Sequence, residues 1–177
     1  MDRGNVRIVA LPVSSWREYK QLRLRALEKE PSAFCSTHKR ESVWPDEKWQ
    51  QTLQDAADRK SWIFFAKLDG RLVGLIGGYQ NEEDTQNHRV QVWGMYVDEL
   101  HRTKGVAKAL VKRLLQEFAR SKDIRTVRLE VNADQEAARH LYGRFGFKKV
   151  GAEPVVFGDG LSHEAIIMEK ELPHPLN

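Results

Sequence analysis

A basic turn with one glycine, at residues 101–105, carries the clearest chemical signal in the chain. Gly105 lets the backbone approach a ligand closely, and Arg102 and Lys104 add positive charge beside it. The turn leads into a stretch whose apolar residues recur at helical spacing, which predicts a helix over residues 106–118. The first amides of a helix lack internal acceptors and carry the positive end of its dipole. The turn therefore predicts a site for an anion, most often a phosphate.

Two familiar phosphate-binding motifs do not describe this turn. It has no Gly-Lys-Ser/Thr ending, so it is not a P-loop, and it is not a full Gly-x-Gly-x-x-Gly fingerprint. Taken alone, the turn also fits an ordinary amphipathic helix with a basic first turn.

The spacing of Arg102, Gly105 and Ala107 resembles the pyrophosphate-binding motif Arg/Gln-x-x-Gly-x-Gly/Ala of the GCN5-related N-acetyltransferases. A second signature of that family runs Leu-x-Val, then Asn-x-x-Ala-x-x-Leu-Tyr-x-x-x-Gly-Phe, and follows here at the usual separation. The residues on that pattern are Leu129, Val131, Ala138, Leu141, Tyr142, Gly146 and Phe147. Gln135 stands where the family usually has Asn. On these residues the chain is identified as a member of the GNAT family, with residues 89–151 carrying the resemblance.

The resemblance implies that acetyl-coenzyme A is the co-substrate and that no metal takes part. The pyrophosphate of acetyl-coenzyme A would lie on the basic turn, and its pantetheine arm would lie in a gap that a bulge opens beside the central strand. The amide of Val97, or that of Met95 in a shifted register, would polarise the thioester carbonyl. The residues expected to bind the co-substrate are Met95, Tyr96, Val97, Arg102, Thr103, Lys104, Gly105, Val106, Ala107, Lys108, Gln135 and Tyr142.

The resemblance also implies a catalytic acid and a catalytic base. Tyr142 holds the family position near the sulfur, where a phenol with a reference pKa of about 10 can protonate the departing thiolate. A tyrosine that only packs in the core is the alternative. Glu130 holds the Leu-Glu-Val position of the base in the ribosomal-protein acetylases of this family. In other relatives that residue is structural and a water chain removes the proton, so both alternatives stay open.

Periodicity predicts the elements that must position these residues. Strands are expected at residues 7–11, 61–68, 71–79, 90–97, 126–131, from 147 and at 163–169, and helices at 15–30, from 45, at 106–118 and at 134–145. Ser15 and Glu18 have capping-box spacing, and Asp69-Gly70 predicts a hairpin. In the central strand, Val90, Val92, Gly94 and Tyr96 are expected to share one face.

The strand–helix–strand unit at residues 89–131 requires a parallel pair within an otherwise antiparallel sheet. We therefore expect an α/β fold (α+β by some schemes), the GNAT fold, with a mixed sheet of about seven strands flanked by about four helices. Residues 1–172 should form a single domain, and residues 173–177 a loose tail.

The composition fits such a domain. The chain has 177 residues, 41% hydrophobic and 31% charged, with a net charge of +4. The positive charge is scattered among acidic residues, so an anionic co-substrate explains it and no nucleic-acid or membrane partner is expected. No apolar run is long enough to span a membrane and no signal peptide is visible, so a cytoplasmic location is expected. The single cysteine, Cys35, excludes a disulfide framework, and the histidines show no metal-binding spacing.

The function predicted from the resemblance is direct transfer of an acetyl group from acetyl-coenzyme A to a primary amine of a small molecule, protein or peptide. The acceptor is expected to lie against residues 30–44, 81–88 and 156–163, with Glu82, Glu83 and Asp84 as further candidates. A coenzyme A-binding sensor without an acceptor site is the main alternative, and a nucleic-acid-binding module is a second. Association into a homodimer is left open.

Overall fold

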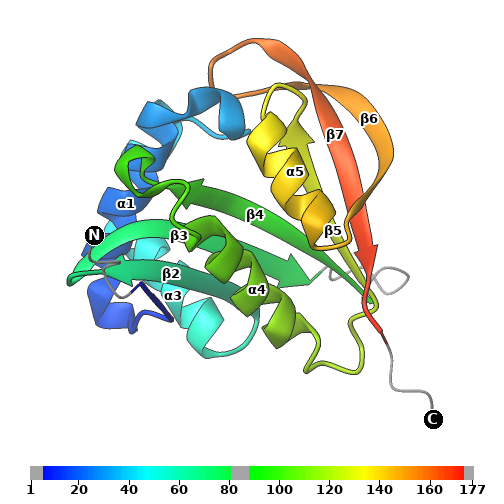
Figure 1. The fold of residues 1–177 in the computed structure, drawn as a ribbon. Coiled ribbons are helices and arrows are strands. Elements are labelled where there is room, and N and C mark those ends of the chain that lie inside the picture. The colour runs from blue at the N-terminus through cyan, green and yellow to red at the C-terminus, as the bar shows by residue number, and fades with distance from the viewer. Residues whose placement is uncertain (1–5, 81–87, 174–177) are drawn as a thin grey trace.

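A seven-stranded mixed sheet forms the middle layer of the molecule in the computed structural model, which describes residues 6–80 and 88–173 (Figure 1). The strand order is β1-β2-β3-β4-β5-β7-β6. The strands are β1 (Arg7–Val9), β2 (Ser61–Leu68), β3 (Arg71–Gln80), β4 (Arg89–Val97), β5 (Thr126–Asn132), β6 (Lys148–Val156) and β7 (Ser162–Glu171). β4 and β5 run parallel and the other neighbouring pairs run antiparallel, so the predicted mixed sheet is confirmed.

Helices cover both faces of the sheet (Figure 1). They are α1 (Trp16–Lys29), α2 (His38–Ser42), α3 (Asp46–Ala57), α4 (Val106–Phe118) and α5 (Glu136–Arg144). α4 and α5 lie in front of the sheet in the view of Figure 1, and α1 and α3 pack on the opposite face. The short helix α2 was not predicted; the Thr37 hydroxyl caps it by accepting a hydrogen bond from the Arg40 amide at 3.0 Å.

Two hydrophobic cores hold these layers together. The apolar stripe of α4 packs with one face of β2–β5, while α1 and α3 bury aromatic and aliphatic side chains against the other. Glycines in β3 make room for aromatic rings, because a Cβ at Gly77 would lie 2.2 Å from the Trp93 ring and one at Gly78 2.6 Å from the Phe118 ring. Each large apolar side chain buried in this way contributes roughly 1.5–3 kcal/mol to the stability of the folded state.

β4 carries a bulge that corrects the predicted alternation of its side chains. Trp93 pairs with Gly77 and Tyr96 with Leu75, so two residues of β4, Gly94 and Met95, oppose a single residue of β3. Gly94 has φ +71°, a conformation that suits glycine. Because of the extra residue, Tyr96 packs in the α1/α3 core while Val90 and Val92 pack in the α4/α5 core. The prediction that Tyr96 shares a face with Val90 and Val92 was therefore wrong.

Some local predictions at element ends were also wrong. Ser15 lies in a 3-10 turn and its side chain makes no capping hydrogen bond to α1, so the expected capping box is not formed. β6 runs on to Val156 and includes Pro154, which an edge strand tolerates. The expected tail falls almost entirely outside the described residues, so the proposed domain bounds stay a prediction.

Candidate active site

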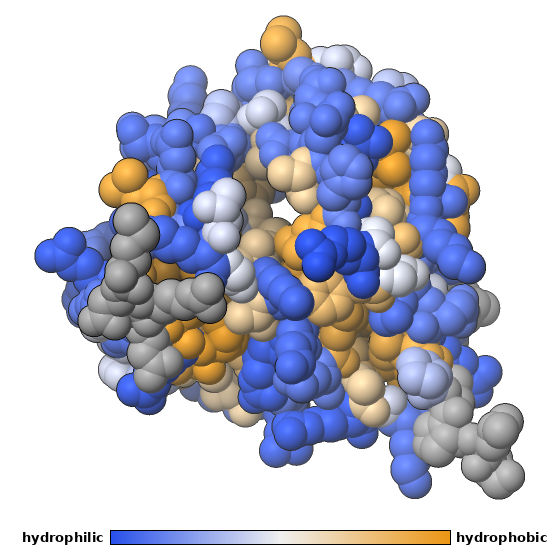
Figure 2. Space-filling model, in the orientation of Figure 1, coloured by the Kyte–Doolittle hydropathy of each residue, from blue (hydrophilic) through white to orange (hydrophobic). Residues whose placement is uncertain are grey.

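β4 and β5 separate after the first three residues of each strand. Their parallel pairing covers only residues 89–91 of β4 and 126–128 of β5 within the described chain. Beyond these pairs lies a cleft of about 670 Å³ bounded by the end of β4, the start of α4 and one side of α5. Figure 2 shows the surface hollowed there, with hydrophobic atoms around the hollow and polar groups at its rim. This cleft is the gap that the sequence predicted beside the central strand.

The cleft leads to the N-terminus of α4. Gly105 caps the helix with φ +83°, and Thr103 before it also has a positive φ of 62°. A Cβ at Gly105 would meet nothing within 4 Å, so the space beside it is open. The first-turn amides of α4 have no acceptor within the helix, and the dipole adds positive potential. The start of α4 is thus suited to an anionic group.

The two basic residues of the turn are held in different ways. Arg102 donates from Nε to the Val97 carbonyl at 3.0 Å and from Nη2 to the Glu30 carboxylate at 2.5 Å. Lys104 donates to the Leu100 carbonyl at 2.9 Å and is not among the residues that line the cleft. Every other residue expected to bind the co-substrate lines it: Met95, Tyr96, Val97, Arg102, Thr103, Gly105, Val106, Ala107, Lys108, Gln135 and Tyr142.

The backbone of Val97 faces the cleft. The amide of Asp98 donates to the Val73 carbonyl on β3 at 2.8 Å. Because successive residues of a strand direct their amides to opposite edges, the Val97 N–H points away from β3 and toward the gap. Its carbonyl faces the same way, which is why it accepts the hydrogen bond from Arg102.

Tyr142 lies where the cleft meets a small pocket of about 90 Å³ between β4, β5 and α5, and it lines both. Its side chain is 5% exposed and packs edge-on against Phe147, with ring centroids 5.6 Å apart. Burial raises the pKa of Tyr142 above its ordinary value, so the phenol keeps its proton near neutral pH. No group in the described part of the chain hydrogen-bonds the phenol, which leaves its proton available.

Glu130 lines the small pocket together with Tyr142. It lies on β5, where that strand has separated from β4, and its side chain is exposed. The two predicted catalytic residues are therefore brought to the same pocket, and the cleft opens on the Tyr142 side of it.

Long-range contacts build the wall of the small pocket, and sequence reasoning missed them. Asn132, buried at the end of β5, donates from Nδ2 to the Ser32 carbonyl at 2.9 Å and so fixes the segment after α1. The Gly158 amide donates to the Phe34 carbonyl at 2.7 Å. A Cβ at Gly158 would lie 2.5 Å from the Ser36 carbonyl oxygen, which explains the glycine. These contacts join two of the segments predicted to bind the acceptor; residues 81–87 of the third, with Glu82, Glu83 and Asp84, lie outside the described residues.

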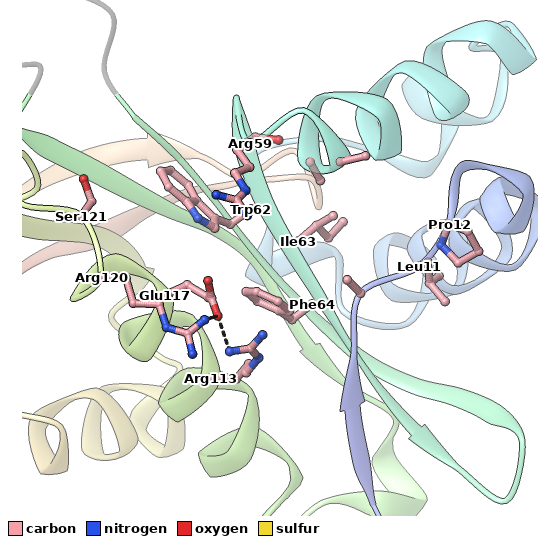
Figure 3. A pocket seen from close by; sticks show the side chains of 14 residues that line it. Leu11, Pro12, Arg59, Trp62, Ile63, Phe64, Arg113, Glu117, Arg120 and Ser121 are labelled. Atoms are coloured by element: carbon pink, nitrogen blue, oxygen red, sulfur yellow. Dashed lines mark hydrogen bonds and ion pairs between the residues drawn. The ribbon is translucent and has the colours of Figure 1, made fainter.

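A second hollow, of about 750 Å³, lies at the C-terminal end of α4 (Figure 3). Glu117 of α4 lines this hollow and accepts hydrogen bonds from Arg113 on the same helix and from Arg120 just after it. The Arg113 guanidinium also lies 4.7 Å from the centroid of the Phe64 ring. None of the predicted site residues lines this hollow, and its charged groups are largely paired with one another.

Within residues 6–80 and 88–173, no group of His, Cys, Asp and Glu side chains is arranged to hold a metal ion. None of the helices in those ranges is long and apolar enough to cross a membrane.

Comparison with known proteins finds a matching family, curated relatives and solved structures with the same fold. The model of the acetyltransferase (GNAT) family matches residues 21–147. Human N-acetyltransferase 8 is 36% identical over 54% of this chain and 42% of its own length, and N-acetylaspartate synthetase of Xenopus tropicalis is 36% identical over 60% and 38%. The chain thus spans well under half the length of these curated relatives. A Salmonella typhimurium structure solved with its cofactor acetyl-CoA shares the fold, with a TM-score of 0.81, 16% identity and coverage of 98% of this chain and 97% of that one.

Proposed function

Because this chain belongs to the acetyltransferase (GNAT) family, we propose that it transfers the acetyl group of acetyl-coenzyme A directly to a primary amine. The observation that carries this proposal is the continuity of the cleft, which runs from the free amides of α4, past the Val97 N–H, to Tyr142 at the small pocket. A long, bent ligand with an anionic middle and a reactive end fits such a path. The acceptor is a small-molecule amine or an amine of a protein or peptide.

The residues of the chain divide the work of binding. The amides at the start of α4 donate hydrogen bonds to the pyrophosphate oxygens, and Lys108 and Arg102 add positive charge at the rim of the cleft. The pantetheine arm lies along the open edge of β4, which Met95, Tyr96 and Val97 line and where β5 no longer pairs with the backbone groups of Val97. Gln135, at the N-cap of α5, provides a polar side chain from the opposite wall.

The transfer step needs three further contributions. The amine nitrogen, once deprotonated, attacks the thioester carbon and forms the C–N bond, while the Val97 N–H stabilises the negative charge on the oxygen. The C–S bond then breaks, and the sulfur leaves as a thiolate. Tyr142 gives its proton to that thiolate, and the resulting phenolate regains one from solvent. Glu130, directly or through water, takes the proton that the ammonium loses before attack. The second proton, which the nitrogen loses as the amide forms, goes to solvent and balances the one that the phenolate regains.

Activity is tested by thiol release from acetyl-coenzyme A with a panel of polyamines, amino acids, aminoglycosides and short peptides. We expect release that depends on an added amine, with mass spectrometry showing one acetyl group on that amine. Tight coenzyme A binding without release for any amine would instead support the coenzyme A-binding sensor.

A further inference from the structure

An arginine of α1 lies behind the small pocket, and within the described residues only two of its three guanidinium nitrogens form hydrogen bonds. Arg23 is 7% exposed and donates from Nε and Nη2 to the Glu41 carboxylate, at 2.9 and 2.7 Å. Its third nitrogen, Nη1, is buried and has no hydrogen-bond partner among the described residues. Buried donors without partners are rare in folded proteins, so this nitrogen calls for an explanation.

The surroundings of Nη1 connect it with the pocket. A Cβ built at Gly94 would lie 3.7 Å from Nη1, and the guanidinium carbon lies 5.0 Å from the Phe34 ring centroid and 5.8 Å from that of Trp93. Gly94, Phe34 and Trp93 all line the small pocket. Since Gly94 has no side chain, none stands between its backbone, which lines the pocket, and the guanidinium.

A carboxylate and a guanidinium N–H donor, whose positive charge Glu41 already balances, therefore stand on the two sides of the small pocket. Glu130 lines it from β5, and Arg23 stands behind the β4 side at Gly94. Glu130 favours an ammonium group and disfavours a carboxylate, whereas a free guanidinium nitrogen favours a carboxylate oxygen. A ligand with an amine at one end and a carboxylate close by at the other meets both demands, and the small volume of the pocket favours a compact molecule.

We infer that the acceptor is a small amine bearing a carboxylate, of the α-amino acid class, and that Arg23 Nη1 binds the carboxylate while the amine faces Glu130 and Tyr142. This inference rests on the proposed function and names the substrate class of the same site. Arg23 is then an acceptor-binding residue, and its pairing with Glu41 fixes the direction of Nη1.

The unchanged protein supplies the first test. Thiol release from acetyl-coenzyme A is measured with the standard L-α-amino acids, with their carboxamides and with the matched amines that lack the carboxyl carbon, and rates are compared per fraction of free amine. For the best amino acid we expect kcat/KM to fall at least tenfold in the carboxamide and further in the simple amine. Equal values within threefold, or release with simple amines alone, would overturn the inference and leave the proposed function standing. No release with any amine would contradict the proposed function itself.

A variant separates carboxylate binding from a purely structural ion pair. Replacing both partners, Arg23→Leu with Glu41→Leu, removes the guanidinium without leaving a buried carboxylate alone. We expect KM for the amino acid to rise at least tenfold and the preference over the carboxamide to vanish, with unchanged acetyl-coenzyme A affinity. Retention of that preference in a folded double variant would contradict the role of Arg23. If the double variant does not fold, the comparison of acceptors on the unchanged protein decides.

Discussion

Arg102 Nη2 and Glu30 Oε1 lie 2.5 Å apart at the rim of the cleft, so a carboxylate already holds the guanidinium expected to meet the pyrophosphate. The two side chains are 43% and 28% exposed, which makes the ion pair a weak one. Removing the negative charge with Glu30→Gln frees Arg102 and lessens repulsion of the co-substrate. Since exposed pairs contribute about 0.2–1 kcal/mol, we expect coenzyme A to bind up to about fivefold more tightly by calorimetry. Glu28→Gln, at an exposed position in the last turn of α1 just before Glu30, is the matched control. Weaker binding in Glu30→Gln would mean that Glu30 positions Arg102.

Substitutions at Gly105 test whether the start of α4 binds the pyrophosphate. A Cβ there meets no protein atom within 4 Å, so added bulk acts on the ligand, whereas φ +83° penalises most residues through the backbone. The affinity of Gly105→Val for coenzyme A should be at least tenfold lower than that of the wild type. Gly105→Asn tolerates the left-handed conformation and still adds bulk, so it should also bind weakly while melting close to the wild type. Calorimetry and thermal denaturation separate the two effects, and unchanged affinity in both variants would refute the site.

Glu130 is tested by the pH dependence of the rate. A base is needed only while the amine is protonated, so Glu130→Gln should reduce kcat/KM at pH 7 by about 10²-fold and recover toward pH 10, near the pKa of an ordinary amine. Glu153→Gln, an exposed carboxylate of β6, serves as the control. A loss of the same size at every pH would assign Glu130 to binding or structure, and an unchanged profile would leave proton removal to water.

His163 links the loop after β6 to the start of α5 and should make stability depend on pH. Its Nε2 lies 2.7 Å from Asp159 Oδ2, and its Nδ1 lies 3.4 Å from Asp134 Oδ2. The hydrogen bond to Asp159 raises the pKa of His163 above its ordinary value of about 6.5. The folded protein therefore holds this proton more tightly, and the stabilisation is complete below pH 6.5 and is lost as the pH rises through the folded pKa.

The same contact has an acid limit. A backbone hydrogen bond from Leu161, with His163 as a further cause, lowers the pKa of Asp159, so its contribution is present above about pH 4 and is lost as the pH falls further. From pH 6 to pH 8.5, the melting temperature of the wild type should fall by more than that of His163→Gln. The exposed His38→Gln variant is the control and should behave like the wild type. Parallel melting curves in wild type and His163→Gln would contradict this.

The sequence predicted those parts of the fold that depend on local patterns. The helix of residues 106–118 has its predicted bounds because Gly105 and the apolar stripe specify its start and one face. Asp69 and Gly70 both have positive φ, as the hairpin turn between β2 and β3 requires. The parallel pair and the gap beside β4 also follow the prediction.

The small pocket was harder to predict, because its walls come from distant parts of the chain. Asn132 holds Ser32, 100 positions earlier, and Arg23 pairs with Glu41 from another helix. No pattern in either segment indicates its partner. Gly94 did offer a signal, since a lone glycine inside a strand often marks a bulge, and the bulge moved Tyr96 to the other face.

If the cleft delivers an acetyl thioester to Tyr142, the Tyr142→Phe variant should lose turnover and keep co-substrate binding. Phenylalanine keeps the ring that packs on Phe147 and removes only the phenolic proton, which burial keeps on the oxygen. With saturating acetyl-coenzyme A and the best amine, kcat should fall by about 10²-fold or more, with little change in co-substrate affinity by calorimetry. A variant that turns over at near the wild-type rate would contradict the account.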